Sequence, residues 1–353
     1  MSSSDKKSRG IVFWLGIIFI LCVSGWLYLI FYGDSDKAWR ALLINFVFFT
    51  PLASGMIVWP AVVTASQGIW AKPLQRTAFA AIYFAPVSIA AFIALWIGHS
   101  HWAGWATHPN LLQGFWLYYK FVFLRDIIAL VLIWALCAAY VARARRGAPG
   151  KLAGWLCFAY GVVFTLIAFD MVMALDPHWF STLFGGYFFV SGMYAALAAW
   201  TVLSILSGTT TVEHRHDLGK LTVAVSLLTA YMMYSQLLPI WYENLPAEVR
   251  FVIPRMTISQ WRYISAVLTA TIFLGPLVLL VTRWSKRSPV FLTAVSMLML
   301  VCLWIERWWE VTPTLGGKLT FGLTEASITA AFVAAFLLSV IIFTNRQKTA
   351  ISG

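Results

Sequence analysis

The stretch ALLINFVFFTPLASGMIVWPAVVTAS, residues 41–66, decides the fold class of this chain, because it contains no acidic, basic or histidine residue. A helix of about 20 apolar residues crosses the hydrocarbon core of a bilayer, so this stretch is long enough to span it. Other stretches of the same kind occur along the whole chain. The sequence therefore predicts an all-α polytopic membrane protein with about ten transmembrane helices, at residues 11–32, 41–66, 77–98, 118–142, 152–175, 180–206, 220–243, 262–282, 289–309 and 322–344.

The composition supports the same class. Hydrophobic residues make up 61% of the 353 residues and charged residues only 11%, whereas a soluble domain carries about 25% charged residues. The net charge of +12 does not indicate nucleic-acid binding, because the basic residues lie in small groups between apolar stretches. Such groups are typical of loops beside anionic lipid headgroups, so the lipid bilayer is the expected environment.

The distribution of Lys and Arg predicts the orientation. Of the 25 Lys and Arg residues, 16 lie on the side of the N-terminus and 8 on the other side, with Arg125 near the mouth of the fourth span. Cytoplasmic loops carry the excess of basic residues, so both termini are expected in the cytoplasm. The first apolar stretch, 11–32, is too long for the core of a signal peptide and is predicted to be the first span.

An internal repeat with a period of about 137 residues relates spans two to five to spans six to nine. An even number of spans in each unit makes this a parallel repeat rather than an inverted one. The matching positions are Gly55 and Gly192 in Ser-Gly-Met triplets, Arg125 and Arg262 at the starts of spans, and Asp170 and Glu306, 136 residues apart, each followed seven residues later by a proline.

The repeat predicts two tandem four-helix bundles with one flanking helix at each end of the chain. The expected parts are an N-terminal tail with the first span at 1–40, a first bundle at 41–178, a second bundle at 179–315, and the last span with a cytoplasmic tail at 316–353.

Charged side chains inside a bilayer are costly, so each is expected to have a structural or functional reason. In the predicted orientation they all lie in the outer halves of the spans or at the outer rim. Asp170 is the deepest acid, about six residues from the end of its span, or about 9 Å at 1.5 Å per residue. The ionisable candidates are Arg125, Asp126, Asp170, Asp176, Glu243, Arg262, Glu306, Arg307 and Glu310.

Two interpretations of these residues stay open and are compatible. In the first, Arg125 with Asp170 and Arg262 with Glu306 are ion pairs that fix each bundle. In the second, the residues form a water-accessible polar layer that carries protons or binds a polar headgroup. A proton path through the whole membrane is disfavoured, because the inner halves of the spans hold hydroxyl groups but almost no acids or histidines.

The cysteines and histidines disfavour a metal or haem site. A haem inside the bilayer needs axial ligands within facing helices. The cysteines lie singly in apolar stretches, and the histidines lie in loops or at the ends of spans: Cys22, Cys137, Cys157 and Cys302; His99, His101, His108, His178, His214 and His216. We therefore expect no metal ligand, no cofactor bound by this chain, and no catalytic residue that the sequence identifies with certainty.

Several stretches resemble a known family. They are residues 169–182 (FDMVMALDPHWFST), 216–221 (HDLGKL), 234–246 (YSQLLPIWYENLP) and 304–313 (WIERWWEVTP). These stretches resemble the ActF subunit of bacterial alternative complex III, within the wider NrfD/polysulfide-reductase-like family. The resemblance runs in order through spans four to nine and is weakest in the first and last spans.

The resemblance implies a cofactor-free membrane subunit of a respiratory quinol:cytochrome c oxidoreductase in the bacterial inner membrane. The implied partners are an ActC-like (NrfD-type) membrane subunit, on whose side quinol would bind, an iron–sulfur subunit and multihaem cytochrome c subunits. Ion-pair candidates are Arg125, Arg262, Arg307 and Glu310. The residues that match proposed proton-path positions near the periplasmic side are Asp170, Asp176, His178, Glu243 and Glu306.

Other functions remain as alternatives. In the second alternative the chain itself binds quinone, as catalytic NrfD-type subunits of other oxidoreductases do. Asp176 and His178, beside Trp179 and Phe180, would then hold the quinol headgroup. A non-catalytic membrane anchor or a transporter is the third alternative. Kinks are hinted at by Gly275-Pro276 and Pro86, but no charge near the membrane midplane accompanies them, as a transporter would normally require.

Overall fold

The computed structural model describes residues 3–107, 114–316 and 321–352, and in these ranges it contains helices and no β-strand. Ten helical segments there are long and apolar enough to cross a membrane, so the prediction of a multi-pass all-α membrane protein is confirmed. The segments are α1 (Ser3–Tyr32), α2 (Ser35–Ala65), a third span made of η1 (Lys72–Leu74), α3 (Gln75–Phe79), η2 (Ala80–Phe84) and α4 (Ala85–Ile97), α6 (Tyr119–Arg145), α7 (Leu152–Met171) with η5 (Met173–Leu175), α8 (Phe184–Leu206), α9 (Val212–Glu243), an eighth span made of α12 (Ser259–Leu268), η6 (Thr269–Leu274) and α13 (Gly275–Leu279), α15 (Pro289–Val311) and α16 (Leu323–Ser352).

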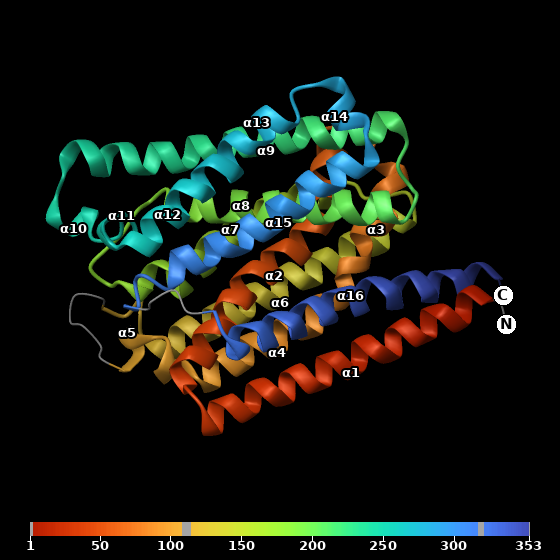
Figure 1. Cartoon of the computed structure of the whole chain (residues 1–353). Coiled ribbons are helices and arrows are strands. Elements are labelled where there is room, and N and C mark those ends of the chain that lie inside the picture. Colours follow the sequence, from red (N-terminus) through yellow and green to blue (C-terminus); the bar gives the residue numbers. More distant parts are fainter. Residues whose placement is uncertain (1–2, 108–113, 317–320, 353) are drawn as a thin grey trace.

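The helices lie side by side in one elongated bundle (Figure 1). The start of α1 and the end of α16 lie at the same end of the bundle, which we call the terminal end; the opposite end is the far end. An even number of spans requires this arrangement. Short helices cap the bundle: η3 (His99–His101), α5 (Gly104–Thr107), α10 (Pro246–Val249) and α11 (Ile253–Thr257) at the far end, and α14 (Arg283–Arg287) at the terminal end.

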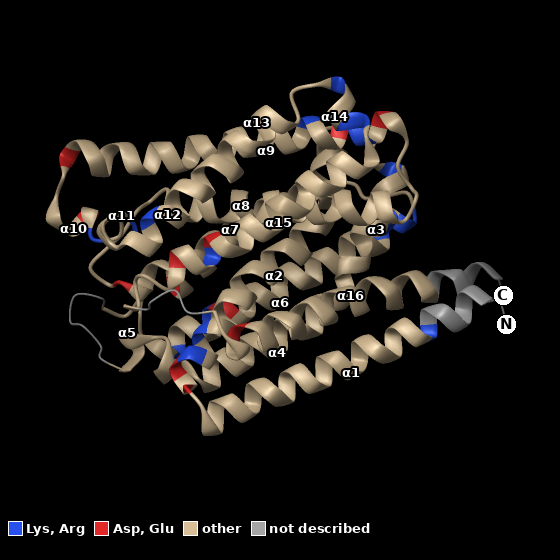
Figure 2. Cartoon of the chain, viewed as in Figure 1, with Lys and Arg blue, Asp and Glu red and all other residues tan. Residues whose placement is uncertain are grey.

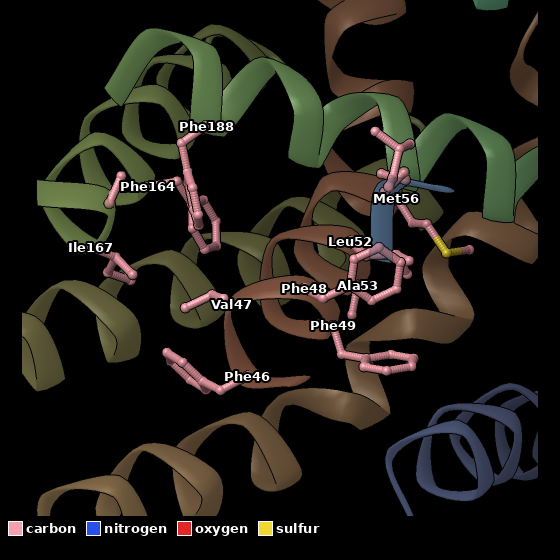
Figure 3. Close-up of a cluster of buried hydrophobic side chains, with 14 of the residues drawn as sticks. Phe46, Val47, Phe48, Phe49, Leu52, Ala53, Met56, Phe164, Ile167 and Phe188 are labelled. Carbon is pink, nitrogen blue, oxygen red and sulfur yellow. The ribbon is translucent and has the colours of Figure 1, made fainter. Parts of the chain in front are cut away.

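Helix α2 lies at the centre of the bundle. Every residue of its most apolar window is buried, and the helix contacts α4, α7, α8, α15 and α16. A helix that is apolar on all sides is stable only where other helices cover it all round. Figure 3 shows hydrophobic side chains of α2 packed among those of its neighbours, with Phe46, Val47 and Phe49 of α2, Phe164 and Ile167 of α7, and Phe188 of α8.

Glycines allow α2 and α8 to approach each other closely. A Cβ atom at position 55 would lie 2.9 Å from the Cβ of Ala196, and one at position 192 would lie 2.9 Å from the Cβ of Pro51. Between membrane helices no hydrophobic force acts, so van der Waals packing of small residues supplies much of the attraction. The glycine pair of the sequence repeat thus lies at the contact between the two predicted bundles.

The remaining contacts group the central spans in two sets. Helices α4, α6 and α7 pack with α2, whereas α9, α12, η6 and α15 pack with α8 or with one another. The contacts of α8 with α2 and α7, and of α15 with α2, join the two sets.

Helices α1 and α16 pack against each other, although they lie at opposite ends of the sequence. Figure 1 shows the red and dark blue helices together on one side of the bundle, where α16 covers α2 and η2. Most of the surface of α1 is exposed, so in a bilayer this surface faces lipid or another protein.

Prolines interrupt two of the spans. Proline has no backbone N–H, so the carbonyl four residues earlier loses its usual helical partner. Before Pro86 the chain forms the 3₁₀ helix η2, and the N–H of Ala85 donates to the carbonyl of Ile82 instead. Before Pro276 it forms the π-helix η6, and the hydroxyl of Tyr194 donates to the carbonyl of Ile272 at 3.4 Å. A π-turn inside a span frequently accompanies a functional site.

Substitution of the interface glycines tests the packing of α2 on α8. We expect Gly55→Ala and Gly192→Ala to lower the thermal unfolding midpoint of the detergent-solubilised protein, because an added methyl group in a closely packed contact costs about 1–3 kcal/mol. The control is Gly154→Ala in α7, where nothing lies within 4 Å of the added Cβ. Equal unfolding midpoints for all three variants and the unmodified protein would contradict the close contact.

Candidate functional site

The buried charges all lie toward the far end of the bundle. Figure 2 shows most Lys and Arg at the terminal end, and charged positions inside the bundle only in its far half. Burial of a charge is costly unless it is paired and hydrogen-bonded. Among the described residues the buried charged side chains are Asp126, Asp170, Arg255, Glu306, Arg307, Glu310 and Glu325.

The first cluster consists of Arg125 and Asp126 on α6 and Asp170 on α7. The Arg125 guanidinium donates from Nη2 to Asp170 Oδ2 at 2.5 Å, and its Nε lies 3.9 Å from Asp126 Oδ1. The same guanidinium lies over the ring of Trp116, with 3.9 Å between the guanidinium carbon and the ring centroid. One cation therefore faces two buried carboxyl groups, and the predicted pair of Arg125 with Asp170 is present.

The carboxyl groups of the first cluster keep unused hydrogen-bonding capacity. Among the described residues, neither oxygen of Asp126 has a hydrogen-bond partner, and neither does Asp170 Oδ1. A buried carboxyl oxygen without a protein partner is a place where a proton or a water molecule is bound favourably. The first cluster can therefore accept a proton without breaking the bond between Arg125 and Asp170.

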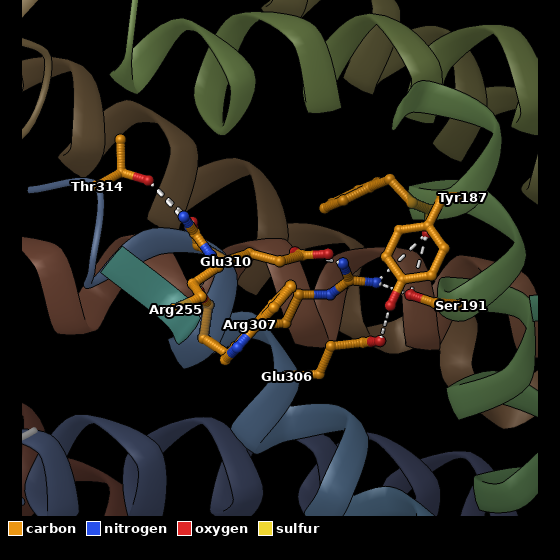
Figure 4. A network of polar contacts seen from close by, with 9 residues as sticks. Tyr187, Ser191, Arg255, Glu306, Arg307, Glu310 and Thr314 are labelled. Atoms are coloured by element: carbon orange, nitrogen blue, oxygen red, sulfur yellow. Dashed lines mark hydrogen bonds and ion pairs between the residues drawn. The ribbon is translucent and has the colours of Figure 1, made fainter. Parts of the chain in front are cut away.

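The second cluster consists of Glu306, Arg307 and Glu310 on α15 with Tyr187 and Ser191 on α8 (Figure 4). Arg307 Nη1 donates to Glu310 Oε2 at 2.6 Å, and Nη2 donates to Ser191 Oγ and to the carbonyl oxygen of Phe188. The Tyr187 hydroxyl donates to Glu306 Oε1. One arginine again accompanies two buried carboxyl groups, and Glu306 Oε2 and Glu310 Oε1 have no partner in the part of the chain that the structure describes.

Arg255 on α11 anchors the far-end loop to the second cluster. It is 1% exposed, and it donates to the carbonyl oxygens of Trp309 (2.9 Å), Glu310 (2.6 Å) and Phe251 and to Thr314 Oγ1 (2.9 Å). Burial lowers the pKa of Arg255 to about 9, against the raising effect of Glu310 and Asp176, so the guanidinium stays charged at neutral pH.

A cavity of about 40 Å³ lies beside Glu306, between α8, α9, the eighth span and α15. Its lining includes Tyr187, Ser265, Glu306, and Thr269 and Ile272 of the π-helix η6. A cavity of this size accommodates a water molecule where polar groups line it. The second cluster therefore borders a space large enough for one water molecule.

The predicted ion pair of Arg262 with Glu306 is wrong. Arg262 is exposed, its guanidinium lies 5.6 Å from the ring centroid of Tyr263, and among the described residues it forms no ion pair. Glu306 is bonded instead by Tyr187, and the neighbouring arginine on its own helix fills the role that Arg125 has in the first cluster.

The reason is a shift in register. The buried face of the eighth span matches that of α6 at an offset of 139 residues rather than 137, so that Ser265 takes the place of Asp126. A shift of two residues turns a position by about 200° around a helix, which moves Arg262 to the outer surface. The buried positions that match are Trp261 and Val122, Ser265 and Asp126, Leu268 and Ala129, Ile272 and Ile133, and Pro276 and Cys137.

The other predicted proton-path residues lie outside the two clusters. Asp176 is partly buried at the far end and forms an ion pair with Arg250 at 3.2 Å, and its Oδ1 accepts from the backbone N–H of His178. The His178 side chain is exposed, as is Glu243 at the end of α9. The structure thus brings Asp170 and Glu306 into buried clusters, and leaves Asp176, His178 and Glu243 at the surface of the far end.

Sequence reasoning missed Arg255, Tyr187 and Ser191. Arg255 stands in a short loop, where a charge normally faces water, and only the neighbouring Pro254 in an apolar segment indicated a constrained turn. Tyr187 and Ser191 are four residues apart, hence on one face of a helix, and this spacing in an otherwise apolar span was the available signal.

The fold and these two clusters define a multi-pass helical membrane protein with two buried groups of one arginine and two carboxylic acids each. Within the described ranges no three His, Cys, Asp or Glu side chains gather as metal ligands would; His108 lies outside the described residues. Comparison of the chain with protein-family models and with curated proteins gives no match.

Removal of the buried arginine tests the second cluster. We expect Arg307→Met to destabilise the solubilised protein strongly, because breaking a buried ion pair by removing one partner costs about 3–5 kcal/mol. Arg262→Met is the matched control, since its side chain is exposed and unpaired within the described chain; a change within about 0.5 kcal/mol is expected. Thermal unfolding followed by tryptophan fluorescence measures the stability of both variants. An equal loss of stability in Arg307→Met and Arg262→Met would contradict the assignment of Arg307 to a buried ion pair.

Proposed function

We propose that this chain is a cofactor-free membrane subunit of a respiratory quinol:cytochrome c oxidoreductase of the alternative complex III type, and that its buried carboxyl groups carry protons near the far end. The observation that carries the proposal is the pair of clusters in which one arginine accompanies two carboxyl groups with unpartnered oxygens. The resemblance of residues 169–182 and 304–313, the segments that contain Asp170 and Glu306, to that family supports it.

The chemistry of quinol oxidation explains why such clusters would be useful. Each quinol that is oxidised gives up two electrons and two protons, and the protons must leave the membrane. A buried carboxyl group beside an arginine accepts a proton, because protonation removes the excess negative charge, and releases it when the surroundings change. In the proposed arrangement the electrons pass through the partner subunits, and this chain handles protons.

The placement of charge supports proton release toward one side only. Asp126, Asp170, Glu306 and Glu310 lie in the far halves of their spans, whereas the buried polar groups of the terminal half are hydroxyls such as Thr201 and Ser204. With cytoplasmic termini, the far end faces the periplasm of a bacterial inner membrane. The partners in this proposal are a quinone-binding sister subunit, an iron–sulfur subunit and multihaem cytochromes c.

The clusters also stabilise the bundle, and this structural role does not exclude proton transfer. The two roles are separable because some substitutions remove an acid but keep the short hydrogen-bonded ion pairs of Arg125 with Asp170 and of Arg307 with Glu310. Arg125 donates directly to Asp170 at 2.5 Å but lies 3.9 Å from Asp126, so we expect Asp126→Asn to leave the bond of Arg125 to Asp170 in place. Glu306→Gln keeps a carbonyl oxygen for the hydroxyl of Tyr187.

The test uses the native complex, purified from its host through an affinity tag on this chain. We expect haem and iron–sulfur subunits to co-purify, and we expect Asp126→Asn and Glu306→Gln to lower quinol:cytochrome c turnover about a hundredfold, the lower end of the loss when a positioned proton acceptor is removed. Glu243→Gln, at an exposed site, is the control. Full turnover of Asp126→Asn and Glu306→Gln in a correctly assembled complex would show that the clusters have a structural role only. Co-purification of unrelated proteins in place of haem and iron–sulfur subunits would contradict the proposed assembly.

A further inference from the structure

A group of basic side chains lies at the terminal end of the bundle, where the short helix α14 packs on α9. Figure 2 shows basic positions gathered around α14. We call this group the basic corner, and its members come from the start of α9 and from α14: Arg215, Lys220, Arg283, Lys286 and Arg287. The start of α9 also carries Glu213 and Asp217. With the histidines neutral, five basic and two acidic side chains leave an excess of three positive charges.

Hydrogen bonds and close packing fix the basic corner. Arg215 Nε donates to the carbonyl oxygen of Arg287 at 2.7 Å, which ties α9 to α14. The side chain of Lys286 crosses α9 at Gly219, where an added Cβ would lie 2.6 Å from the Cγ of the lysine. Lys286 Nζ then donates to the carbonyl oxygen of Leu280 at 2.7 Å, at the end of the eighth span. The cations of α9 and α14 are therefore held side by side.

Most of these cations have no counter-ion in the protein. Among the described residues, Lys220 is the only member of the basic corner in an ion pair, with Asp217 at 2.7 Å. Arg283 and Arg287 lie four residues apart on α14, hence on one face of the helix, and both are exposed. Guanidinium groups bind phosphate oxygens through paired hydrogen bonds. The two arginines therefore present a surface that suits a phosphate.

A lipid-facing apolar strip begins beside the two arginines. Val278, Val281 and Trp284 follow one another at intervals of three residues and are 68–70% exposed. A tryptophan at the end of a span lies at the level of the headgroups, because its ring is amphipathic. Arg283 and Arg287 flank this tryptophan, so they lie at the level of lipid phosphates, with the two valines at the level of acyl chains.

The charge of the corner selects among phospholipids. A phosphoethanolamine headgroup carries an amine whose positive charge the excess of basic residues repels. A phosphoglycerol headgroup carries no such amine and has a net negative charge. Basic groups at the cytoplasmic ends of membrane helices recognise anionic lipids, and the predicted orientation places the terminal end in the cytoplasm. A free phosphate would use the arginines but not the apolar strip.

We propose that the basic corner binds an anionic phospholipid of the phosphatidylglycerol type. Its phosphate lies on Arg283 and Arg287, and its acyl chains lie along Val278 and Val281. The bound lipid neutralises part of the excess charge and holds α14 against α9. The site lies at the opposite end of the bundle from the two buried clusters, so the inference does not rest on the proposed function.

The test is a titration of the purified full-length chain in detergent with phosphatidylglycerol, followed by native mass spectrometry. We expect the double variant Arg283→Gln/Arg287→Gln to bind the lipid about thirtyfold more weakly, the effect of two charges lost beside an anionic headgroup. The matched control is Arg146→Gln/Lys151→Gln, which removes two exposed charges from the same end of the bundle, between α6 and α7, and should keep full affinity.

Three outcomes would overturn the proposal. Equal losses in the two double variants would show only a general attraction of the basic terminal end for anions. Equal binding of phosphatidylglycerol and of phosphatidylethanolamine with the same acyl chains by the unmodified chain would contradict the selection by charge. Displacement of the lipid by an equal concentration of inorganic phosphate would show that the apolar strip contributes nothing. The last two measurements use the unmodified chain, so they do not depend on the folding of any variant.

Discussion

A charge inside a bilayer has to be paired, and the arrangement of this protein follows from that constraint. Arg125 reaches across from α6 to Asp170 on α7, and Arg307 on α15 binds Glu310 and two groups of α8. Both arginines form their bonds in the far half of the bundle, where the cost of burial is lowest because the interface is near. In the terminal half, the buried polar groups are hydroxyls, and the helices are held together by apolar packing such as that of α2 on α8. The same distribution leaves two excess carboxyl groups in one half of the bundle, as the proposed release of protons on one side requires.

The apolar centre and the polar far end depend on each other. Helix α2 can be buried on every side because residues 41–65 carry no charge and other helices cover them all round. Helix α8, which packs on α2, also carries Tyr187 and Ser191, whose side chains bond to Glu306 and Arg307 of α15. The eighth span, by contrast, is interrupted by η6 and borders both the cavity at Glu306 and the lipid-facing surface. Packing thus fixes the arginines, while the interrupted span leaves room beside one of the acids. The proposed transfer of protons relies on both features, the fixed ion pair and the adjacent space.

The sequence was sufficient to predict the spans and the positions of the charges along them, because hydrophobicity and helical rise determine these. It also predicted the pair of Arg125 and Asp170, since each lies near the outer end of its span. It did not predict the partner of Glu306, because a two-residue change of register between the repeats turns Arg262 outward, and a repeat period read from a few matches does not detect such a shift. The contact of α1 with α16 and the anchoring of α11 by Arg255 depend on tertiary packing between segments far apart in the chain, for which one sequence contains no local signal.

The central claim is that the buried carboxyl groups gain and lose protons during turnover. Infrared difference spectroscopy of the purified complex measures this directly, because the carbonyl stretch of a protonated carboxylic acid is separate from the absorption of its carboxylate. Upon addition of quinol, we expect a difference band of a buried carboxylic acid that is absent in Asp126→Asn and Glu306→Gln and unchanged in Glu243→Gln. A spectrum without any carboxylic-acid band, or with the same band in all variants, would show that the clusters keep their protonation during the reaction and only hold the helices together.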